Sequence, residues 1–145
     1  MRTPEVLLVD DNPADTDLTS EVLARTGSPS HIHAVTDGVE AMAFLRREGK
    51  YANALLPDLV ILDLSLPKKD GRSVLSEVKA DPVLRKIPIA IFSTSEAQRD
   101  IVRSYELGAN CYVSKPGNLQ GFISAVTSIG EFWFGLARLP REENL

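Results

Sequence analysis

Cysteine, histidine and long apolar runs are what this sequence has least of. Cys111 is the single cysteine, and His31 and His33 are the only two histidines among 145 residues. One cysteine excludes an internal disulfide and favours a reducing cytoplasm. The same scarcity disfavours a Cys/His metal cluster and thiol catalysis. No apolar run reaches the length of a membrane-spanning helix, and the first residues do not resemble a signal peptide.

A large excess of one charge is also missing. The 16 lysines and arginines stand against 20 aspartates and glutamates, which gives a formal net charge of −4 without a basic stripe. This balance disfavours a nucleic-acid-binding surface. Hydrophobic residues make up 43% of the chain and charged residues 25%, as in an ordinary globular protein. The length suits one domain.

What the sequence does contain is a regular alternation of strand and helix patterns. Five strands are predicted, over residues 5–9, 31–36, 59–62, 87–92 and 111–114, and the second is expected near a sheet edge. Five such units predict an α/β fold in which helices cover both faces of a five-stranded parallel sheet. Two strand orders remain open: the flavodoxin-like 2-1-3-4-5 and one half of a dinucleotide-binding fold. The first turn lacks the Gly-x-Gly-x-x-Gly pattern, which disfavours the second.

Capping signals mark the start of several helices. Pro13 suits the first turn of a helix, with Asp11 or Asn12 as its cap. Asn118 is expected to cap the last helix. Two further starts are predicted by residue pairs with the capping-box spacing, Asp37 with Glu40 and Ser95 with Gln98. The helix after the second pair is expected to be lined by apolar residues: Ile101, Val102 and Tyr105.

Polar residues stand where four of the predicted strands end: Asp10 and Asp11 after the first, Asp63 after the third, Ser93 after the fourth and Lys115 after the fifth. Each alone has an ordinary explanation as a helix cap, a turn residue or a solvated lysine. In the 2-1-3-4-5 order the first and third strands are neighbours, and all five residues reach one edge of the sheet. Ligands of open α/β sheets bind at that edge, so the coincidence favours a functional site.

Three carboxylates at one edge repel one another unless a cation compensates them. Oxygen ligands alone indicate a hard ion, Mg²⁺ before Ca²⁺. Mg²⁺ often completes its shell with phosphate oxygens, and a carboxylate can itself accept a phosphoryl group. The ammonium of Lys115 and the hydroxyl of Ser93 are suited to neutralising the transferred group. The residues therefore predict phosphoryl-transfer chemistry.

Over essentially its whole length the sequence resembles a response-regulator receiver domain. The matching segments are residues 8–11, 61–63, 67–71, 93–94 and 112–116. The resemblance implies the 2-1-3-4-5 order and Asp63 as phosphoacceptor. It implies that Mg²⁺ is bound by Asp11, Asp63 and the backbone carbonyl of Ser65, while Asp10 acts through metal-bound water. In the same way it assigns phosphoryl binding to Ser93 and Lys115, the conformational switch to Ser93 and Tyr112, and a cis bond to Lys115-Pro116.

A narrower resemblance concerns residues 11–15, 66–71, 104–107 and 132–134, which are similar to small regulators that partner phytochrome-type histidine kinases. It implies a histidine kinase as partner and no enzymatic activity beyond self-phosphorylation and self-dephosphorylation. Thr94 is bulkier than the residue usual in receivers, which predicts a longer phosphoryl lifetime.

Several alternatives to a terminal regulator remain to be weighed. A phosphate-relay intermediate stays open. A pseudo-receiver that only binds a partner should lack Asp63 or Lys115, and both are present. A hydrolase of the haloacid-dehalogenase type needs an acid where Asn12 stands. A flavin-binding protein needs a Ser/Thr-rich phosphate loop after the first strand, and none is found there.

The C-terminal region carries more apolar residues than one buried stripe requires. Residues 1–130 are expected to form the receiver, and residues 131–145 an extension of the last helix and a tail. In the last helix the predicted apolar stripe includes Trp133, whereas Phe132 and Phe134 are expected to point elsewhere. We therefore predict a homodimer with Phe132, Trp133 and Phe134 in its interface.

Overall fold

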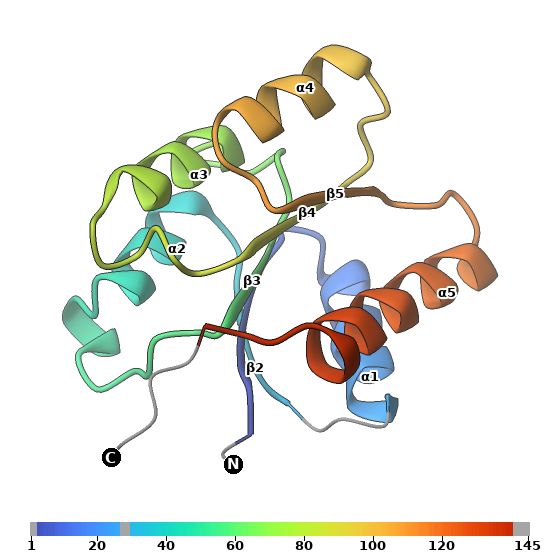
Figure 1. Ribbon diagram of the computed structural model, residues 1–145, viewed down its shortest axis with the longest axis horizontal. Helices are drawn as coiled ribbons and strands as arrows, with labels where there is room; N and C mark the ends of the chain where they lie inside the picture. Colours follow the sequence, from blue (N-terminus) through green and yellow to red (C-terminus); the bar gives the residue numbers. More distant parts are fainter. Residues whose placement is uncertain (1–2, 27–29, 141–145) are drawn as a thin grey trace.

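A computed structural model describes residues 3–26 and 30–140. Five parallel strands form one sheet in the order β2-β1-β3-β4-β5 (Figure 1). The strands are β1 (Glu5–Val9), β2 (His31–Val35), β3 (Leu59–Leu62), β4 (Ile89–Ser93) and β5 (Cys111–Ser114). This order confirms the flavodoxin-like α/β fold and differs from that of a dinucleotide-binding half.

The most apolar strands occupy the centre of the sheet because both of its faces are covered there. All residues of β1, β3 and β4 are buried, whereas the edge strands β2 and β5 are buried only in part. The edge position predicted for β2 is confirmed. Strand β4 begins two residues later than predicted, because the Ile87 amide bonds to the Leu84 carbonyl in the preceding turn and Pro88 has no amide hydrogen.

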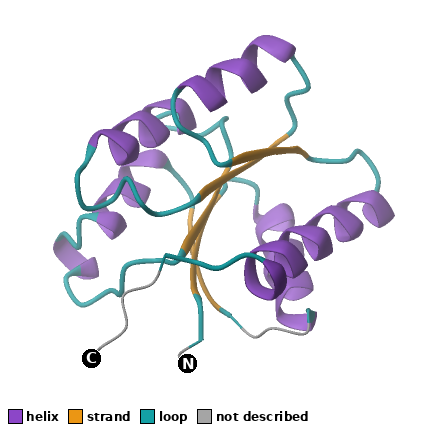
Figure 2. Cartoon of the chain, viewed as in Figure 1, coloured by secondary structure: helices purple, strands orange, loops and turns teal. Residues whose placement is uncertain are grey.

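Five α-helices form the outer layers, and Figures 1 and 2 show how they divide between the two faces of the sheet. Helices α1 and α5 cover one face, and α2, α3 and α4 cover the other. Their bounds are α1 Pro13–Arg25, α2 Gly38–Leu45, α3 Gly71–Ala80, α4 Gln98–Glu106 and α5 Leu119–Gly130. A short 3₁₀ helix, η1 (Gly49–Tyr51), follows α2, and a π-helical segment, η2 (Glu131–Leu136), follows α5.

Two of the predicted helix caps form as expected, and both capping boxes need correction. Asn12 and Asn118 accept hydrogen bonds from backbone amides in the first turns of α1 and α5. Asp37 caps α2, but the Glu40 carboxylate accepts a hydrogen bond from the Tyr51 hydroxyl. The Ser95 cap is wrong because α4 begins later, after Ala97, which provides no side-chain cap.

The apolar face predicted for α4 is also largely wrong. Ser104 is its only buried residue, whereas Val102 and Tyr105 are 46% and 50% exposed. The helix lies beside the edge strand β5, where there is less sheet to cover (Figure 1). An apolar pattern indicates a helix but does not by itself determine how much of that helix is buried.

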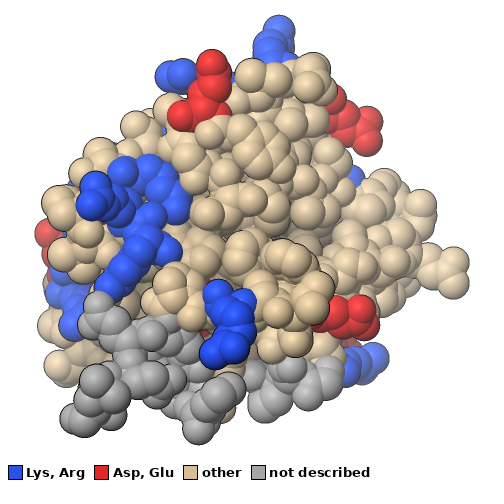
Figure 3. All heavy atoms as spheres, in the orientation of Figure 1, with Lys and Arg blue, Asp and Glu red and all other residues tan. Residues whose placement is uncertain are grey.

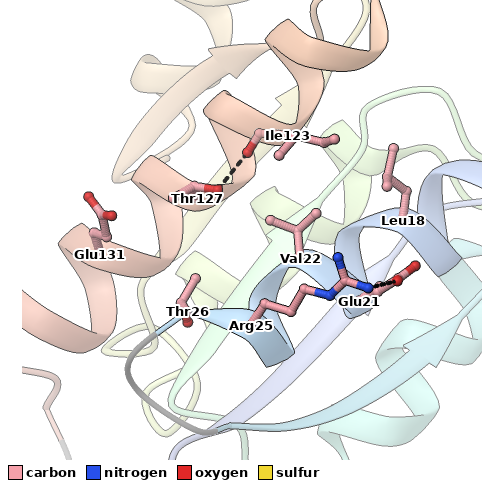
Figure 4. A pocket seen from close by; sticks show the side chains of 8 residues that line it. All are labelled: Leu18, Glu21, Val22, Arg25, Thr26, Ile123, Thr127 and Glu131. Carbon is pink, nitrogen blue, oxygen red and sulfur yellow. Dashed lines mark hydrogen bonds and ion pairs between the residues drawn. The ribbon is translucent and has the colours of Figure 1, made fainter.

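Helices α1 and α5 pack against each other and leave a shallow groove between them (Figure 4). Three aliphatic side chains, Leu18, Val22 and Ile123, line the groove, and an ion pair between Arg25 and Glu21 borders it. Glu131, at the start of η2, also lies on its border. The chain therefore turns from α5 into η2 close to α1.

Charged side chains are unevenly distributed over the face seen in Figure 3. Lysines and arginines gather toward the left of that view, and the surface from β5 at the centre to α5 at the right carries few charges. Within residues 3–26 and 30–140, no helix has the length and apolar character needed to cross a membrane.

Candidate functional site

The carboxyl ends of β1, β3, β4 and β5 bring the five predicted site residues to one edge of the sheet. Asp10, Asp63, Ser93 and Lys115 are all buried there, while Asp11 is exposed. The register of the sheet explains why these residues lie together. The backbone amide of Asp63 donates to the Val9 carbonyl at 2.9 Å, and the backbone amide of Lys115 donates to the Ser93 carbonyl at 2.7 Å. The residues that follow these strands therefore lie side by side.

Both carboxylate oxygens of Asp63 accept hydrogen bonds. The Ser93 hydroxyl and the Ser65 backbone amide each donate to Oδ1 at 3.1 Å. The Lys115 ammonium donates to Oδ2 at 2.9 Å. A carboxylate held in this way keeps one orientation, and two of its donors, Ser93 and Lys115, are the residues predicted to bind the phosphoryl group.

Gly71 lets α3 begin directly against the end of β3. A Cβ atom at this position would lie 2.3 Å from the Asp63 carbonyl oxygen and 2.7 Å from the Leu64 Cα atom. Both contacts are with backbone that cannot move aside, so a side chain here would displace the loop that carries Asp63. The turn that follows the acid therefore depends on a glycine.

The Lys115 ammonium contacts three carboxylates, which follow β1, follow β3 and lie in the first turn of α1. Nζ lies 2.7 Å from Asp10, 2.9 Å from Asp63 and 2.9 Å from Asp15. Burial alone would lower the pKa of Lys115, but hydrogen bonds to Asp10, Asp63 and Asp15 outweigh it and raise the pKa above the usual value. The lysine is therefore a permanent positive charge at the centre of the site.

The same surroundings favour the charged form of Lys115 but disfavour the charged form of the Asp10 carboxyl. Burial raises its pKa, and hydrogen bonds from Lys115 and the Asn12 amide offset only part of that effect. Since burial disfavours the charged form of Asp10, a further cation at this edge would be favourable.

Three carboxylates of the site are placed to hold such a cation. Asp10, Asp11 and Asp63 each have an oxygen within 4.8 Å of the others, and Asp11 faces solvent, from which an ion enters. Oxygen donors of this kind suit a hard divalent cation that keeps several waters. The residues therefore fit a divalent metal. Ser65 lies two residues beyond Asp63 with its amide on the Asp63 carboxylate, and its carbonyl stays a predicted ligand.

The two predicted switch residues lie on adjacent strands, as expected. Ile91 of β4 pairs with Tyr112 of β5, and Ser93 pairs with Ser114. The half-buried Tyr112 donates its hydroxyl to the Ser95 carbonyl at 2.9 Å, in the loop between β4 and α4. Ser93, two residues earlier, contacts Asp63. The loop therefore connects the phosphoacceptor candidate to the tyrosine.

A chain of contacts that sequence reasoning missed continues from this loop. The Ser95 hydroxyl donates to Asp100 of α4 at 2.6 Å, and Arg72 of α3 donates to the same carboxylate at 2.6 Å. Hydrogen bonds from Ser95 and then Arg72 hold the pKa of Asp100 below its usual value. No local pattern links residues 72, 95 and 100, because the fold alone brings them together.

Asp15 is the other functional candidate that the sequence did not single out. It lies in the first turn of α1, where an acid normally serves the helix dipole. Its position four residues after Asp11, about one helical turn from the site, could have indicated it in the sequence. Only the structure shows its contact with Lys115.

The aromatic residues of η2 differ in exposure. Trp133 and Phe134 both pack against the core between the sheet and helices α1 and α5, so the expectation that Phe134 points elsewhere is wrong. Phe132 remains 48% exposed. Burial raises the pKa of the neighbouring Cys111 thiol, and a hydrogen bond with Trp133 opposes this in part. Residues 141–145 of the predicted extension lie outside the described residues.

The peptide bond between Lys115 and Pro116 is trans, whereas the resemblance to receivers implies a cis bond. A bond before proline adopts either form at similar free energy, so the sequence alone does not decide between them.

Comparison with known proteins agrees with this geometry. The family model described as response regulator receiver domain matches residues 6–127. The response regulator Rcp1 of Synechocystis sp. is 44% identical over 135 residues, which cover 93% of this chain and 92% of that protein.

Two solved structures superpose on nearly the whole chain. The phosphorylated cyanobacterial phytochrome response regulator RcpA is 50% identical, with a TM-score of 0.93, and the match covers 97% of this chain and 100% of that one. The Mn²⁺-bound form of response regulator Rcp1 is 43% identical, with a TM-score of 0.92, over 95% and 99% of the two chains. The chain belongs to the response regulator receiver domain family.

Proposed function

We propose that this receiver accepts a phosphoryl group on Asp63 from a histidine kinase and signals by a change in conformation. The observation that carries the proposal is the Asp63 carboxylate, which lies between the Lys115 ammonium and the Ser93 hydroxyl beside two further acids. An acceptor, a cation, a hydroxyl donor and a place for a metal are the parts that phosphoryl transfer to a carboxylate requires.

In the proposed reaction an Asp63 oxygen attacks phosphorus as the phosphorus–nitrogen bond of a phosphohistidine breaks. The imidazole leaves with the bonding electrons, and Asp63 becomes an acyl phosphate. Lys115 and Ser93 already contact Asp63, so they are placed to bind oxygens of the transferred group. Contacts of Lys115 and Ser93 with those oxygens offset the negative charge that the phosphoryl group brings to the site, which is how such groups favour transfer.

Mg²⁺ is the metal proposed for Asp10, Asp11, Asp63 and the Ser65 carbonyl. When bound it supplies positive charge to the phosphoryl oxygens and offsets the repulsion among the acids. The support from this chain is the cluster of carboxylate oxygens within 4.8 Å, and the Mn²⁺-bound structure of a relative agrees with it.

The proposed donor is a phytochrome-type histidine kinase. The support is the resemblance over nearly the whole chain to a phytochrome response regulator. No enzymatic role is proposed beyond the gain and loss of its own phosphoryl group. A relay would differ by passing that group to a second histidine protein.

The test of the proposed function is phosphorylation with a small acyl-phosphate donor or a purified phosphohistidine kinase. The wild type should gain acid-labile, hydroxylamine-sensitive phosphate only when Mg²⁺ is present. Asp63→Asn should remove that phosphate, and Asp17→Asn, an exposed acid on α1, should not. Equal labelling of the Asp63→Asn variant would contradict the assignment, and an unlabelled wild type would favour a binding module.

A homodimer through the surface around Phe132 is the second part of the proposal. Phe132 is 48% and Leu136 75% exposed, and the surface over β5 and α5 carries few charges (Figure 3). Fully burying an exposed large apolar side chain is worth about 1.5–3 kcal/mol, and the half-exposed Phe132 can supply part of that to association. Trp133 and Phe134 contribute less than predicted because they pack against their own core.

Sedimentation at micromolar concentration tests this assembly. Wild type should sediment as a dimer and Phe132→Ala should shift toward monomer, because two copies of the ring leave the interface. Leu55→Ala removes an equally exposed side chain before β3 and should leave the dimer unchanged. A monomeric wild type, or a fully dimeric Phe132→Ala protein, would refute the interface.

A further inference from the structure

Asp15 occupies a position in the site that a helix-capping role does not explain. Its backbone amide donates to Asn12 as part of the α1 cap, which needs nothing from its side chain. The carboxylate contacts the ammonium of Lys115, the residue that follows β5, at 2.9 Å, 100 residues away in the chain. An acid in the first turn stabilises a helix through the helix dipole, and that role does not require a contact with Lys115.

The Lys115 ammonium has no donor to spare. It carries three N–H groups, and three carboxylates lie within 2.9 Å of Nζ: Asp10, Asp15 and Asp63. A phosphoryl oxygen that binds Lys115 must therefore compete with one of these partners for its hydrogen bond.

Among the three partners, Asp15 is the one most readily released. The side chains of Asp10 and Asp63 are 3% and 8% exposed, and both acids belong to the carboxylate cluster that suits a metal. Asp15 is 27% exposed and lies outside that cluster. On losing the ammonium its carboxylate can be hydrated, whereas a buried carboxylate cannot.

The charge of Asp15, like its hydrogen bond to Lys115, disfavours a phosphoryl group on Asp63. A phosphoryl group on Asp63 carries negative charge, and Asp15 shares a lysine with Asp63, so the two repel each other at short range. The same charge attracts a divalent cation. Removing it should therefore weaken binding of the metal and strengthen binding of the phosphoryl group, each by about three- to tenfold for one partly solvated unit charge.

We propose that Asp15 is a positioning residue that withholds Lys115 from the phosphoryl group and so limits the stability of the phosphorylated state. The role rests on the proposed function of Asp63 as acceptor. It adds a means of setting phosphoryl lifetime that acts through Lys115 and leaves the acceptor, the metal cluster and the switch residues unchanged.

Two titrations of the full chain, followed by backbone amide NMR shifts, test the role of Asp15. The first titrates Mg²⁺ alone, and the second titrates beryllofluoride, a phosphoryl analogue, at saturating Mg²⁺. For Asp15→Asn we expect the dissociation constant for Mg²⁺ to rise and that for beryllofluoride to fall, each about three- to tenfold. A variant that merely loosened α1 would change both constants in the same direction.

Asp17→Asn is the matched control, since it removes an exposed acid from the same helix. It should leave both constants at wild-type values, and equal shifts in both variants would overturn the specific role of Asp15. Unchanged or weakened beryllofluoride binding by Asp15→Asn would also overturn it. If wild type itself failed to bind beryllofluoride, the proposed function would fall instead.

Discussion

Helices α3 and α4 lie next to each other on one face of the sheet, yet different forces hold them there. Helix α3 buries Val74, Leu75 and Val78 completely against the core. Helix α4 buries Ser104 alone and leaves Val102 and Tyr105 half exposed. One helix is therefore fixed mainly by the hydrophobic effect, and the other by polar contacts at its ends and along one side.

The polar contacts of α4 lead directly to the functional site. Asp100 accepts hydrogen bonds from Arg72 of α3 and from Ser95, and the Tyr112 amide donates to the Tyr105 hydroxyl. Elements with little buried apolar surface open at lower free-energy cost than the rest of a fold. The difference between the two helices indicates that α4 is the one that can move when the site changes.

The strongest test of this contrast removes apolar side chains from both helices. Leu75→Ala in α3 should lower the free energy of unfolding by about 2–5 kcal/mol, because it leaves a cavity in a packed core. Val102→Ala in α4 should change it by no more than about 0.5 kcal/mol, since much of that side chain is already in water. Urea denaturation measures both.

If Leu75→Ala and Val102→Ala lowered the free energy of unfolding by similar amounts, the contrast between the two helices would be refuted. A decrease of more than about 2 kcal/mol in the free energy of unfolding of Val102→Ala would also refute it, because substitutions at exposed positions do not cost that much. The dimer proposed above adds a check, since burial of Val102 in an interface would make its loss depend on protein concentration, whereas that of Leu75 would not.

The contrast also marks how far the sequence determines this structure. The central strands were predictable because runs such as Leu59–Leu62 are short and apolar at every position, as is typical of a strand covered on both faces. The meeting of Asp10, Asp63 and Lys115 followed from the strand order, which the family resemblance supplied. The central strands are thus set by a local pattern, whereas the meeting of the site residues also needs the strand order.

What the sequence did not determine depends on contacts between distant segments. Ser95 and Gln98 have the capping-box spacing, but Ser95 donates to Asp100 and accepts from the Tyr112 hydroxyl instead. Helix α4 therefore begins at Gln98 without a cap from Ser95. The charge of Asp15 was visible, whereas its pairing with Lys115 depends on how the first turn of α1 lies against the residue that follows β5. Local periodicity carries no information of that kind.

Removing the ion pair that joins α3 and α4 should have a smaller and more local effect than removing the Leu75 side chain. Arg72→Gln keeps a polar side chain, shorter than that of arginine, and removes the charge that faces Asp100 at 2.6 Å. Global stability should change little, because both partners are partly solvated. Hydrogen exchange of the α4 amides should nevertheless accelerate, while the amides of α3 stay protected by their buried apolar face.

Arg103→Gln is the matched control, since Arg103 lies on α4, is exposed and has only a 4.0 Å contact with Glu106. It should leave exchange in α4 unchanged. The measurement belongs near neutral pH. Hydrogen bonds from Ser95 and Arg72 place the pKa of Asp100 below its usual 3.8, so the pair is intact above that pH and is lost only as the pH falls further.

The decisive reading is how the Arg72→Gln effect is distributed along the chain. If polar contacts hold α4, faster exchange should be confined to α4 and the Ser95 loop, and the NMR signals of Tyr112 should shift because its hydroxyl bonds to that loop. If buried apolar surface held α4 as it holds α3, exchange in the variant would match wild type throughout. Equal acceleration in both helices would mean that they open as one unit, and α4 would then have no separate freedom to carry a signal.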